Sequence, residues 1–211
     1  MAYAVKEIFY SLQGEGAQVG RPSVFCRFAG CNLWTGREED RAAATCSFCD
    51  TDFRGVDGVN GGRYQSAAAL GDAISSLWPS ELPGTGWVIC TGGEPLLQLD
   101  AALIEELHMR GFAVAIETNG TLLAPPGLDW ICVSPKAGAP LIQRSGDELK
   151  VVFPQPEISL DELESLAFEH RFLQPMDGSN LSANTHAAVE YCLDHPVWRL
   201  SLQTHKILEI P

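Results

Sequence analysis

Three cysteines in the first quarter of the sequence lie close enough together to share one metal site. Cys31, Cys46 and Cys49 follow the spacing C-x14-C-x2-C in the stretch "CNLWTGREEDRAAATCSFCD". Iron–sulfur clusters are held by cysteine thiolates, and three thiolates leave one iron of a [4Fe–4S] cluster without a protein ligand. A missing fourth ligand is a defect in a structural site but an open coordination position in a catalytic one.

Two other uses of these thiols remain open at this point. A closed structural zinc site needs four ligands, but His108 is distant along the chain, and Asp50 and Asp52 would be unusual partners for three thiolates. A redox pair of the thioredoxin type would use Cys46 and Cys49. This pair would leave Cys31 without a role. The thioredoxin motif also requires a strand before the pair, and no strand is predicted directly before Cys46.

The remaining cysteines do not indicate a disulfide framework. The total of seven is odd, and three of the other four lie in apolar runs, where we expect small buried side chains. The fourth lies in a helical pattern, and we expect it to be buried in the same way. These four residues are Cys26, Cys90, Cys132 and Cys192.

The charge and the apolar content of the sequence indicate which partners the protein can bind. The formal net charge of −13 repels phosphate backbones and disfavours duplex nucleic acid, whereas a small anionic substrate needs only local positive groups. No apolar run approaches the ~18 residues of a membrane helix. The N-terminal stretch "MAYAVKEIFYSLQGEG" lacks the sections of a secretory signal. We therefore expect a cytoplasmic protein that binds neither nucleic acid nor membranes.

Apolar runs that alternate with amphipathic ones predict the elements that must position the cysteines. The predicted strands are 23–30, 87–93, 112–120, 129–136, 148–153 and 170–176, with a last extended segment at 198–208. The predicted helices are 66–78, 100–111, 159–168 and 182–195, opened by cap residues such as Ser66 and Asp100. Alternating strands and helices predict an α/β fold with a mostly parallel sheet. The long stretch 37–65 carries two of the cysteines and is expected to be a functional loop.

Polar residues recur where the predicted strands end. They are Thr91 and Glu94, Glu117 to Asn119, Ser134 and Lys136, and Gln174 and Asp177. Because parallel α/β sheets bind ligands at the carboxyl ends of their strands, four polar strand ends predict one shared pocket.

The cysteine spacing, the aromatic Phe48 within it and the following "TGGEP" together resemble the radical S-adenosylmethionine (SAM) superfamily. The interval between the first two cysteines is longer here than in the superfamily's common C-x3-C-x2-C loop. The resemblance implies a [4Fe–4S] cluster held by Cys31, Cys46 and Cys49. The amino and carboxylate groups of SAM would take the fourth iron, and an electron from the cluster would split SAM to yield a 5′-deoxyadenosyl radical.

The resemblance also implies a set of SAM contacts. Gly92 and Gly93 would let the backbone approach the SAM amino group, Ser134 and Lys136 would meet its ribose or carboxylate, and Phe48 would face the adenine. The complete implied set is Phe48, Asp50, Gly92, Gly93, Glu94, Ser134, Pro135, Lys136, Gln174, Pro175, Met176 and Asp177.

Motifs over nearly the whole chain are similar to one family within this superfamily. "FYSLQGEG" (9–16), "GGEP", "SPK", "LQP" and "SLQTHK" (201–206), in that order, resemble 7-carboxy-7-deazaguanine synthases. This implies conversion of 6-carboxy-5,6,7,8-tetrahydropterin to 7-carboxy-7-deazaguanine with loss of ammonia, on the route to queuosine and other 7-deazapurines. It also implies Mg²⁺, with Thr51 as an oxygen ligand, an external electron donor such as flavodoxin or ferredoxin, and a homodimer.

The implied fold is an abbreviated, open version of the radical SAM partial (β/α) barrel. Residues 1–211 would form a single radical SAM domain, with a cluster-binding loop at 31–49 and a long following loop to about 65.

The resemblance implies where the pterin would bind. Arg27 would pair with its carboxylate through two hydrogen bonds, and the carboxylate of Pro211 would meet its guanidine-like edge. The implied substrate contacts are Leu12, Gln13, Gly14, Glu15, Arg27, Thr91 and Pro211. Glu117 and His205 are candidates for proton handling.

Two alternative functions remain. A glycyl-radical activating enzyme shares the cluster and the GGEP motif but acts on a protein, and SLQTHK has no explanation there. A non-catalytic metal-binding module explains neither the glycines nor the polar strand ends.

Overall fold

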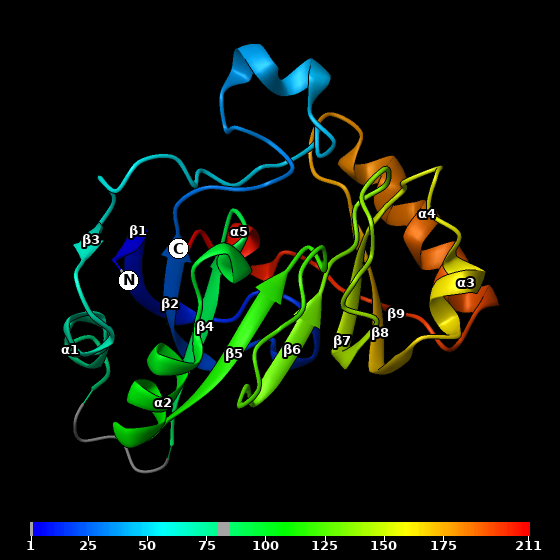
Figure 1. The fold of residues 1–211 in the computed structure, drawn as a ribbon. Coiled ribbons are helices and arrows are strands. Elements are labelled where there is room, and N and C mark those ends of the chain that lie inside the picture. Colours follow the sequence, from blue (N-terminus) through cyan, green and yellow to red (C-terminus); the bar gives the residue numbers. More distant parts are fainter. Residues whose placement is uncertain (1, 80–84) are drawn as a thin grey trace.

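A nine-stranded sheet forms the centre of the computed structural model, which describes residues 2–79 and 85–211. The strand order is β3-β1-β2-β4-β5-β6-β7-β8-β9 (Figure 1). The strands are β1 Tyr3–Leu12, β2 Pro22–Phe28, β3 Gly62–Tyr64, β4 Gly86–Gly92, β5 Phe112–Thr118, β6 Trp130–Val133, β7 Ser145–Phe153, β8 Ala167–Pro175 and β9 Arg199–Leu200.

The sheet is mostly parallel and open. Every neighbouring pair from β2 to β9 is parallel, whereas β1 is antiparallel to both β2 and β3. The two ends of the strand order, β3 and β9, do not pair with each other, so the sheet does not close into a barrel. The predicted α/β class and the abbreviated, open form of the barrel are confirmed.

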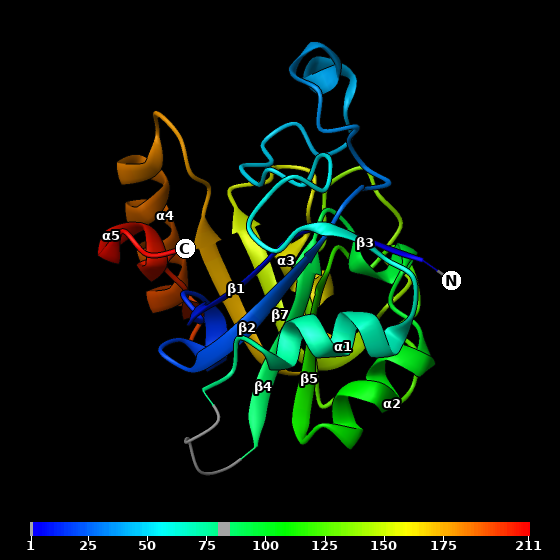
Figure 2. The same cartoon turned by 90° about the vertical axis from the view of Figure 1, so that its left-hand side faces the viewer.

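Helices cover one face of the sheet in two groups, and the last helix of the chain lies on the other face. The helices are α1 Ala67–Ser75, α2 Ala101–Met109, α3 Leu160–Glu164, α4 Leu181–Asp194 and α5 Thr204–Leu208, with short 3-10 turns η1 Gly16–Gln18, η2 Glu38–Ala43 and η3 Pro95–Leu97. Helices α1 and α2 pack beside each other on the β1–β5 side, and α3 and α4 lie near β8 (Figures 1 and 2). In the described chain, loops rather than helices connect β5 to β6 and β6 to β7.

Strand alternation separates the core from the functional face, because successive side chains point to opposite sides of a sheet. On β4, Val88 and Cys90 belong to the core beneath α1 and α2, whereas Ile89 belongs to a smaller apolar cluster on the opposite face. On β7, Leu149 and Val151 pack in the core beneath α3 and α4. The polar residues between these core positions therefore face away from the helices.

Three expectations about element boundaries were wrong. The segment 198–208 is a two-residue strand followed by the short helix α5, not one extended segment. The helix expected at 159–168 ends at Glu164, because Ala167 already belongs to β8. The loop expected at 37–65 contains the 3-10 turn η2 and the edge strand β3. Strand β1 had no counterpart among the predicted strands.

The cysteine predictions are confirmed at three of four positions. Cys26, Cys90 and Cys132 are buried and free, whereas Cys192 on α4 is only half-buried. Cys192 is partly exposed because α4 is a surface helix with one fully buried side chain, that of Ala188.

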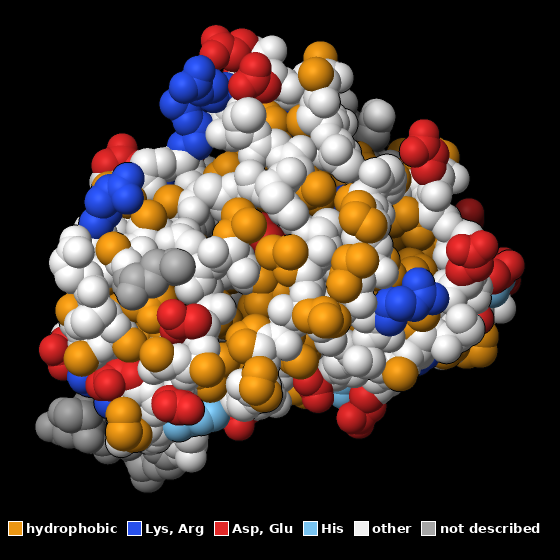
Figure 3. All heavy atoms as spheres, in the orientation of Figure 1, with side chains coloured by type: hydrophobic (Ala, Val, Ile, Leu, Met, Phe, Trp, Pro, Cys, Tyr) orange, Lys and Arg blue, Asp and Glu red, His pale blue; other side chains and the backbone are white. Residues whose placement is uncertain are grey.

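The surface reflects the acidic composition and the gap in the helical layer. Figure 3 shows hydrophobic side chains gathered over the middle of the sheet, between the two helical groups, with Asp and Glu mainly around the rim. Within residues 2–79 and 85–211, no helix has both the length and the apolar character that crossing a membrane requires.

Candidate active site

A cavity of about 400 Å³ lies on the sheet face that α1 to α4 leave uncovered. It is lined by strand ends, the loop after β1, the cysteine loop and the chain's last residues. The predicted site residues that line it are Leu12, Gln13, Gly14, Glu15, Arg27, Cys31, Cys46, Phe48, Cys49, Asp50, Thr51, Thr91, Gly92, Gly93, Glu117, Ser134, Lys136, Gln174, Pro175, Met176, Asp177, His205 and Pro211. Of the predicted set, Glu94 and Pro135 do not line it.

Sheet register places a row of polar side chains across the cavity floor. Arg27 on β2 is opposite Thr91 on β4, and Glu117 on β5 is opposite Cys132 on β6. Lys150 on β7 continues the row. Each is one position away from a core residue, so the alternation that builds the core also turns these groups toward the cavity.

The three cysteines of the loop after β2 share one wall of the cavity. Cys46 is buried, and Cys31 and Cys49 are half-buried. A hydrogen bond from the Cys46 thiol lowers the pKa of Cys49 to about 6, although burial opposes the shift. Within the described residues, no three His, Cys, Asp or Glu side chains converge on a single ion. The ligands of an iron–sulfur cluster need not converge on one ion, since each thiolate binds its own iron. Three thiols along one wall of the cavity fit this arrangement.

The glycine turn after β4 packs directly against the cysteine loop. Gly92 has φ of +138°, a conformation that L side chains rarely adopt. A side chain on Gly92 would meet the Phe28 backbone, and one on Gly93 would meet the Gly30 carbonyl and the Cys31 side chain. The glycines are therefore needed to place the turn beside the first cysteine.

Glu94 fastens this turn to the next strand. Its buried carboxylate accepts hydrogen bonds from the Thr118 hydroxyl at 2.8 Å, the Asn119 amide at 2.8 Å and the Leu96 amide at 2.9 Å. These contacts use both carboxylate oxygens. Glu94 therefore supports the cavity wall without lining the cavity.

Ser134 and Lys136 form a pair beside the cysteines. The Lys136 Nζ donates to the Ser134 carbonyl at 2.6 Å and to its hydroxyl at 2.7 Å. Burial lowers the pKa of Lys136, while the nearby Cys46 and Cys49 thiols oppose that shift. A cation thus lies next to the thiols, where it can meet an anionic group of a ligand.

A lysine of α5 joins two aspartates at the rim of the cavity. Lys206 Nζ lies 2.6 Å from Asp50 Oδ2 and 2.5 Å from Asp177 Oδ2. Lys206 and the Gln203 amide lower the pKa of Asp50 despite its burial. The rim thereby connects the cysteine loop, the end of β8 and α5.

Both chain-terminal regions meet at the remaining wall. The Thr204 amide and hydroxyl both donate to the Gly14 carbonyl at 2.9 Å. A side chain at Gly14 would collide with the His205 ring, so glycine is required there. The Ser11 hydroxyl donates to a Pro211 oxygen at 2.9 Å. The loop after β1 and α5 therefore form one continuous wall.

Arg27 is oriented by a residue of the neighbouring strand. Its Nε lies 2.7 Å from Glu7 Oε1, and its side chain is 20% exposed. Among the described residues, its two terminal nitrogens have no hydrogen-bond partner. This leaves two donors that can bind a carboxylate together.

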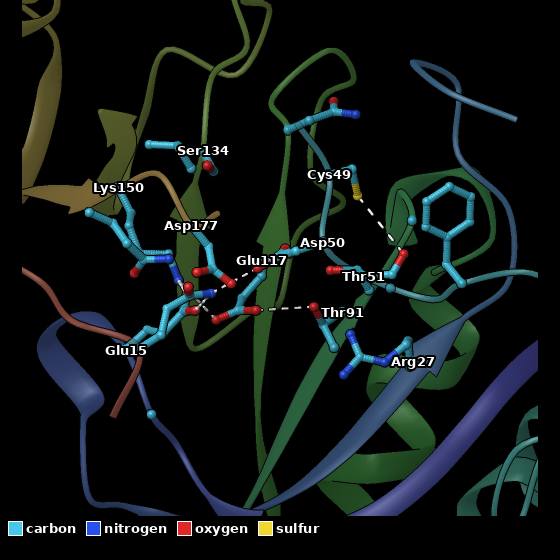
Figure 4. A pocket seen from close by; sticks show the side chains of 18 of the residues that line it. Glu15, Arg27, Cys49, Asp50, Thr51, Thr91, Glu117, Ser134, Lys150 and Asp177 are labelled. Atoms are coloured by element: carbon cyan, nitrogen blue, oxygen red, sulfur yellow. Dashed lines mark hydrogen bonds and ion pairs between the residues drawn. The ribbon is translucent and has the colours of Figure 1, made fainter. Parts of the chain in front are cut away.

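Glu117 is the most heavily bonded polar group of the floor (Figure 4). It accepts from Gln13 Nε2 at 3.1 Å, from Thr91 Oγ1 at 3.0 Å and from Lys150 Nζ at 3.3 Å. Burial raises the pKa of Glu117, but the Lys150 ammonium and these hydrogen bonds outweigh burial and leave the pKa below its ordinary value. The carboxylate is therefore held in the ionised form.

Several cavity residues were missed by the sequence reasoning, above all Lys150, Gln203 and Lys206. The signal for Lys150 was present: a lysine inside the apolar run "ELKVVF" carries a buried charge that needs partners, the same argument that identified Arg27. Gln203 and Lys206 lie inside the SLQTHK motif but were not singled out.

Comparisons with known proteins agree with this geometry. No family model matches the chain. The chain is 64% identical to the 7-carboxy-7-deazaguanine synthase of Bordetella pertussis and 60% identical to that of Caulobacter vibrioides, each over 211 residues and the full length of both proteins. The crystal structure of QueE from Escherichia coli superimposes with a TM-score of 0.70 and 28% identity, covering 96% of this chain and 94% of that one. The chain belongs to the family of 7-carboxy-7-deazaguanine synthases.

Proposed function

We propose that this protein converts 6-carboxy-5,6,7,8-tetrahydropterin to 7-carboxy-7-deazaguanine, with contraction of one ring and loss of ammonia. The observation that carries the proposal is one cavity that joins three cysteine thiols to a carboxylate-binding Arg27 and an ionised Glu117. Cys31, Cys46 and Cys49 would hold a [4Fe–4S] cluster, and SAM bound there would supply the radical chemistry. The protein's own residues bind, orient and shield the reactants.

The cysteine wall holds the cluster and SAM in this proposal. Cys31, Cys46 and Cys49 bind three irons, and Lys136 meets the SAM carboxylate beside them. The other proposed SAM contacts are Phe48, Asp50, Gly92, Gly93, Ser134, Gln174, Pro175, Met176 and Asp177, with Glu94 and Pro135 acting from behind the wall.

The floor and the terminal wall bind the pterin. Arg27 donates to its carboxylate, and Glu15, Glu117 and the Pro211 carboxylate accept from its N–H groups. Carboxylates match paired N–H donors with two parallel hydrogen bonds, as they match an arginine fork. Leu12, Gln13, Gly14 and Thr91 complete the substrate site, and His205 lies across Gly14 as a candidate for proton handling.

Three further parts complete the proposal. Thr51 supplies a hydroxyl to Mg²⁺, a cation that takes oxygen ligands and keeps several waters. The cluster takes its electron from an external donor such as flavodoxin or ferredoxin, and the enzyme works as a homodimer. Residues 1–211 act as one radical SAM domain with the cluster-binding loop at 31–49.

The decisive experiment is anaerobic reconstitution with iron and sulfide, followed by product analysis with the pterin and SAM. The unmodified protein should show the visible absorption of a [4Fe–4S] cluster and form 7-carboxy-7-deazaguanine. Cys46→Ala should lose both the absorption and SAM cleavage, because the cluster would lack one of its three ligands. Cys192→Ala is the matched control, since this half-buried cysteine lies on α4 outside the cavity.

Two results would contradict the proposal in different ways. A Cys46→Ala protein that still assembles a full cluster and turns over would overturn the ligand assignment. A reconstituted wild-type protein that cleaves SAM but leaves the pterin unchanged would overturn the substrate.

A further inference from the structure

Lys150 is a buried cation in the middle of the apolar strand β7. Its side chain is 7% exposed, and its neighbours Leu149 and Val151 pack in the core on the other face. Taking an ammonium group out of water costs several kcal/mol unless ionic and hydrogen-bond partners replace the lost hydration. The proposed reaction assigns no chemical step to this residue, so its place in the cavity floor needs an explanation.

The partners of Lys150 are two carboxylates that face the proposed substrate. Its Nζ lies 2.6 Å from Glu15 Oε2 and 3.3 Å from Glu117 Oε1. The opposite oxygens are also held: Gln203 Nε2 donates to Glu15 Oε1 at 3.1 Å, and Thr91 Oγ1 donates to Glu117 Oε2 at 3.0 Å. Within residues 2–79 and 85–211, Lys150 is the one contact that both carboxylates share (Figure 4).

The shared contact joins separate parts of the fold. Glu15 lies in the loop after β1, Glu117 lies at the end of β5, and Lys150 lies on β7. Neither β1 nor β5 pairs with β7 in the sheet. Gln13 also links the two residues, because its amide donates to Glu117 Oε1 and accepts from the Glu15 backbone N–H, each at 3.1 Å. The ammonium group, however, is the link that contacts both carboxylates directly.

Without the ammonium group of Lys150, the carboxylates around it would repel one another. The buried carboxylate of Glu148, two residues earlier on the same strand face, accepts from the Ala17 amide at 3.0 Å. Three carboxylates thus surround one lysine. The charged and titratable groups that face this cluster from the other elements are Arg27 of β2, Cys132 of β6, Lys136 of the loop after β6 and His205 of α5.

We propose that Lys150 is a positioning residue that holds Glu15 and Glu117 as a fixed pair of anionic acceptors for the N–H groups of the pterin. This inference rests on the proposed function and deepens it. Lys150 acts through the two carboxylates and does not touch the reacting atoms. The cavity thereby selects a substrate that presents N–H donors along the edge opposite Arg27.

Replacement by methionine tests the charge while keeping most of the apolar stem. In Lys150→Met, burial would raise the pKa of Glu117 without an ammonium to oppose it. A protonated Glu117 presents a donor to the donors of the substrate. The pterin KM should rise by about tenfold or more, and the acidic limb of the kcat/KM profile should move to higher pH. The reason is that the ratio of ionised to protonated Glu117 falls tenfold for each unit by which its pKa rises.

Cluster absorption and SAM cleavage without the pterin should remain at wild-type levels in Lys150→Met, since the hydrogen-bond partners of Lys150 in the described residues are Glu15 and Glu117 and none of the three cluster cysteines. Lys150→Arg keeps the charge and should leave the acidic limb in place. The matched control is Arg110→Met. Arg110 bridges Asp72 and Glu106 at 2.8 and 2.7 Å near α1 and α2, away from the cavity, so its loss should move neither KM nor the pH profile.

A second variant covers the case in which Lys150→Met fails to fold. Glu148→Gln combined with Lys150→Met removes one carboxylate together with the lysine and should restore folding while the acidic limb remains displaced. An unchanged pterin KM and pH profile in either variant, with product formed by the wild type, would overturn the inference alone. Failure of the wild type to form the product would overturn the proposed function itself.

Discussion

Thr51 lines the cavity two residues after Cys49, and its side chain lies near Asp50 and Arg27 (Figure 4). At the scale of single residues, the cysteine loop therefore offers the cavity both soft sulfur and hard oxygen donors. Iron–sulfur clusters take thiolates, whereas Mg²⁺ takes oxygen atoms and water. One short segment can thus contact two metal centres of different chemistry without competition between them.

Replacing Thr51 by alanine should weaken the stimulation of activity by magnesium. The hydroxyl is the proposed protein ligand, and the Mg²⁺ concentration for half-maximal stimulation should rise by about tenfold, a loss of roughly 1.4 kcal/mol. Titration of activity with MgCl₂ measures this directly, with SAM binding nearly unchanged. Thr35→Ala is the control, because Thr35 lies on the same loop outside the cavity and donates to Asp40. An identical magnesium dependence in Thr51→Ala and wild type would remove Thr51 from the metal site.

At the scale of elements, caps link the helices to the sheet. The Asp100 carboxylate accepts from the Leu103 amide at 3.0 Å as the N-cap of α2 and from the Tyr3 hydroxyl at 2.7 Å. Tyr3 is 2% exposed and lies at the start of β1. Ser66 caps α1 through the Ala69 amide alone. One carboxylate therefore secures both the start of a helix and the position of the first strand.

Asp100→Ala should destabilise the protein more than Ser66→Ala. Loss of an N-cap costs about 1 kcal/mol, and leaving the buried Tyr3 hydroxyl unpaired adds about 1–3 kcal/mol. Asp100→Ala should therefore lower the free energy of unfolding by about 2–4 kcal/mol, against about 1 kcal/mol for Ser66→Ala. Urea denaturation followed by circular dichroism measures both values. Equal losses in the two variants would show that the Tyr3 contact contributes nothing.

Regular periodicity explains which elements could be predicted from the sequence. The apolar runs of β2, β4 and β5 and the capped helices α1 and α2 were identified because local pattern and tertiary role coincide. Strand β1 was missed because a register shift between Val5 and Glu7 breaks its alternation, so that Tyr3, Val5 and Ile8 are buried. Helix α5 was missed because its first turn is anchored by a distant group, the Gly14 carbonyl.

The site residues that lie in sequence motifs or at predicted strand ends could be predicted from the sequence. The strand-end rule and the family resemblance identified residues that do share one cavity, including Arg27 and Glu117. The apolar run around Lys150 indicated a buried charge, but the partners of Lys150 and Lys206 could not be predicted because they lie far away in sequence. Lys150 contacts Glu15, 135 residues away, and Lys206 contacts Asp50, 156 residues away. Only the folded topology brings such charges together.

At the scale of the whole molecule, the cavity joins the two ends of the sequence. The loop after β1 and helix α5 share hydrogen bonds between Gly14 and Thr204, and the Ser11 hydroxyl donates to Pro211. Proline's restricted φ limits the motion of the last residue. We therefore expect the wall proposed to bind the pterin to be sensitive to changes at a position that tolerates additions in most proteins.

A few residues added after Pro211 should raise the pterin KM sharply, because they convert the proposed carboxylate acceptor into a peptide bond and occupy the cavity. Cluster absorption and SAM cleavage without the pterin should not change, since the side-chain hydrogen-bond partner of Pro211 in the described residues is Ser11 and not one of the three cysteines. Removing the extension back to Pro211 should restore the wild-type KM. An extended enzyme with unaltered pterin kinetics would assign Pro211 a passive role.

The cysteine loop packs separately from the main cores, and this bears on when the proposed cluster can be inserted. The loop is anchored by its own aromatic pair, Trp34 and Phe53, both buried with ring centroids 5.6 Å apart, and the Gly30 amide donates to the Phe53 carbonyl at 3.2 Å. The main cores lie beneath the helices and include none of the three thiols. We therefore expect the protein to fold before the proposed cluster is inserted. Protein prepared without iron should gain the proposed activity when iron and sulfide are added.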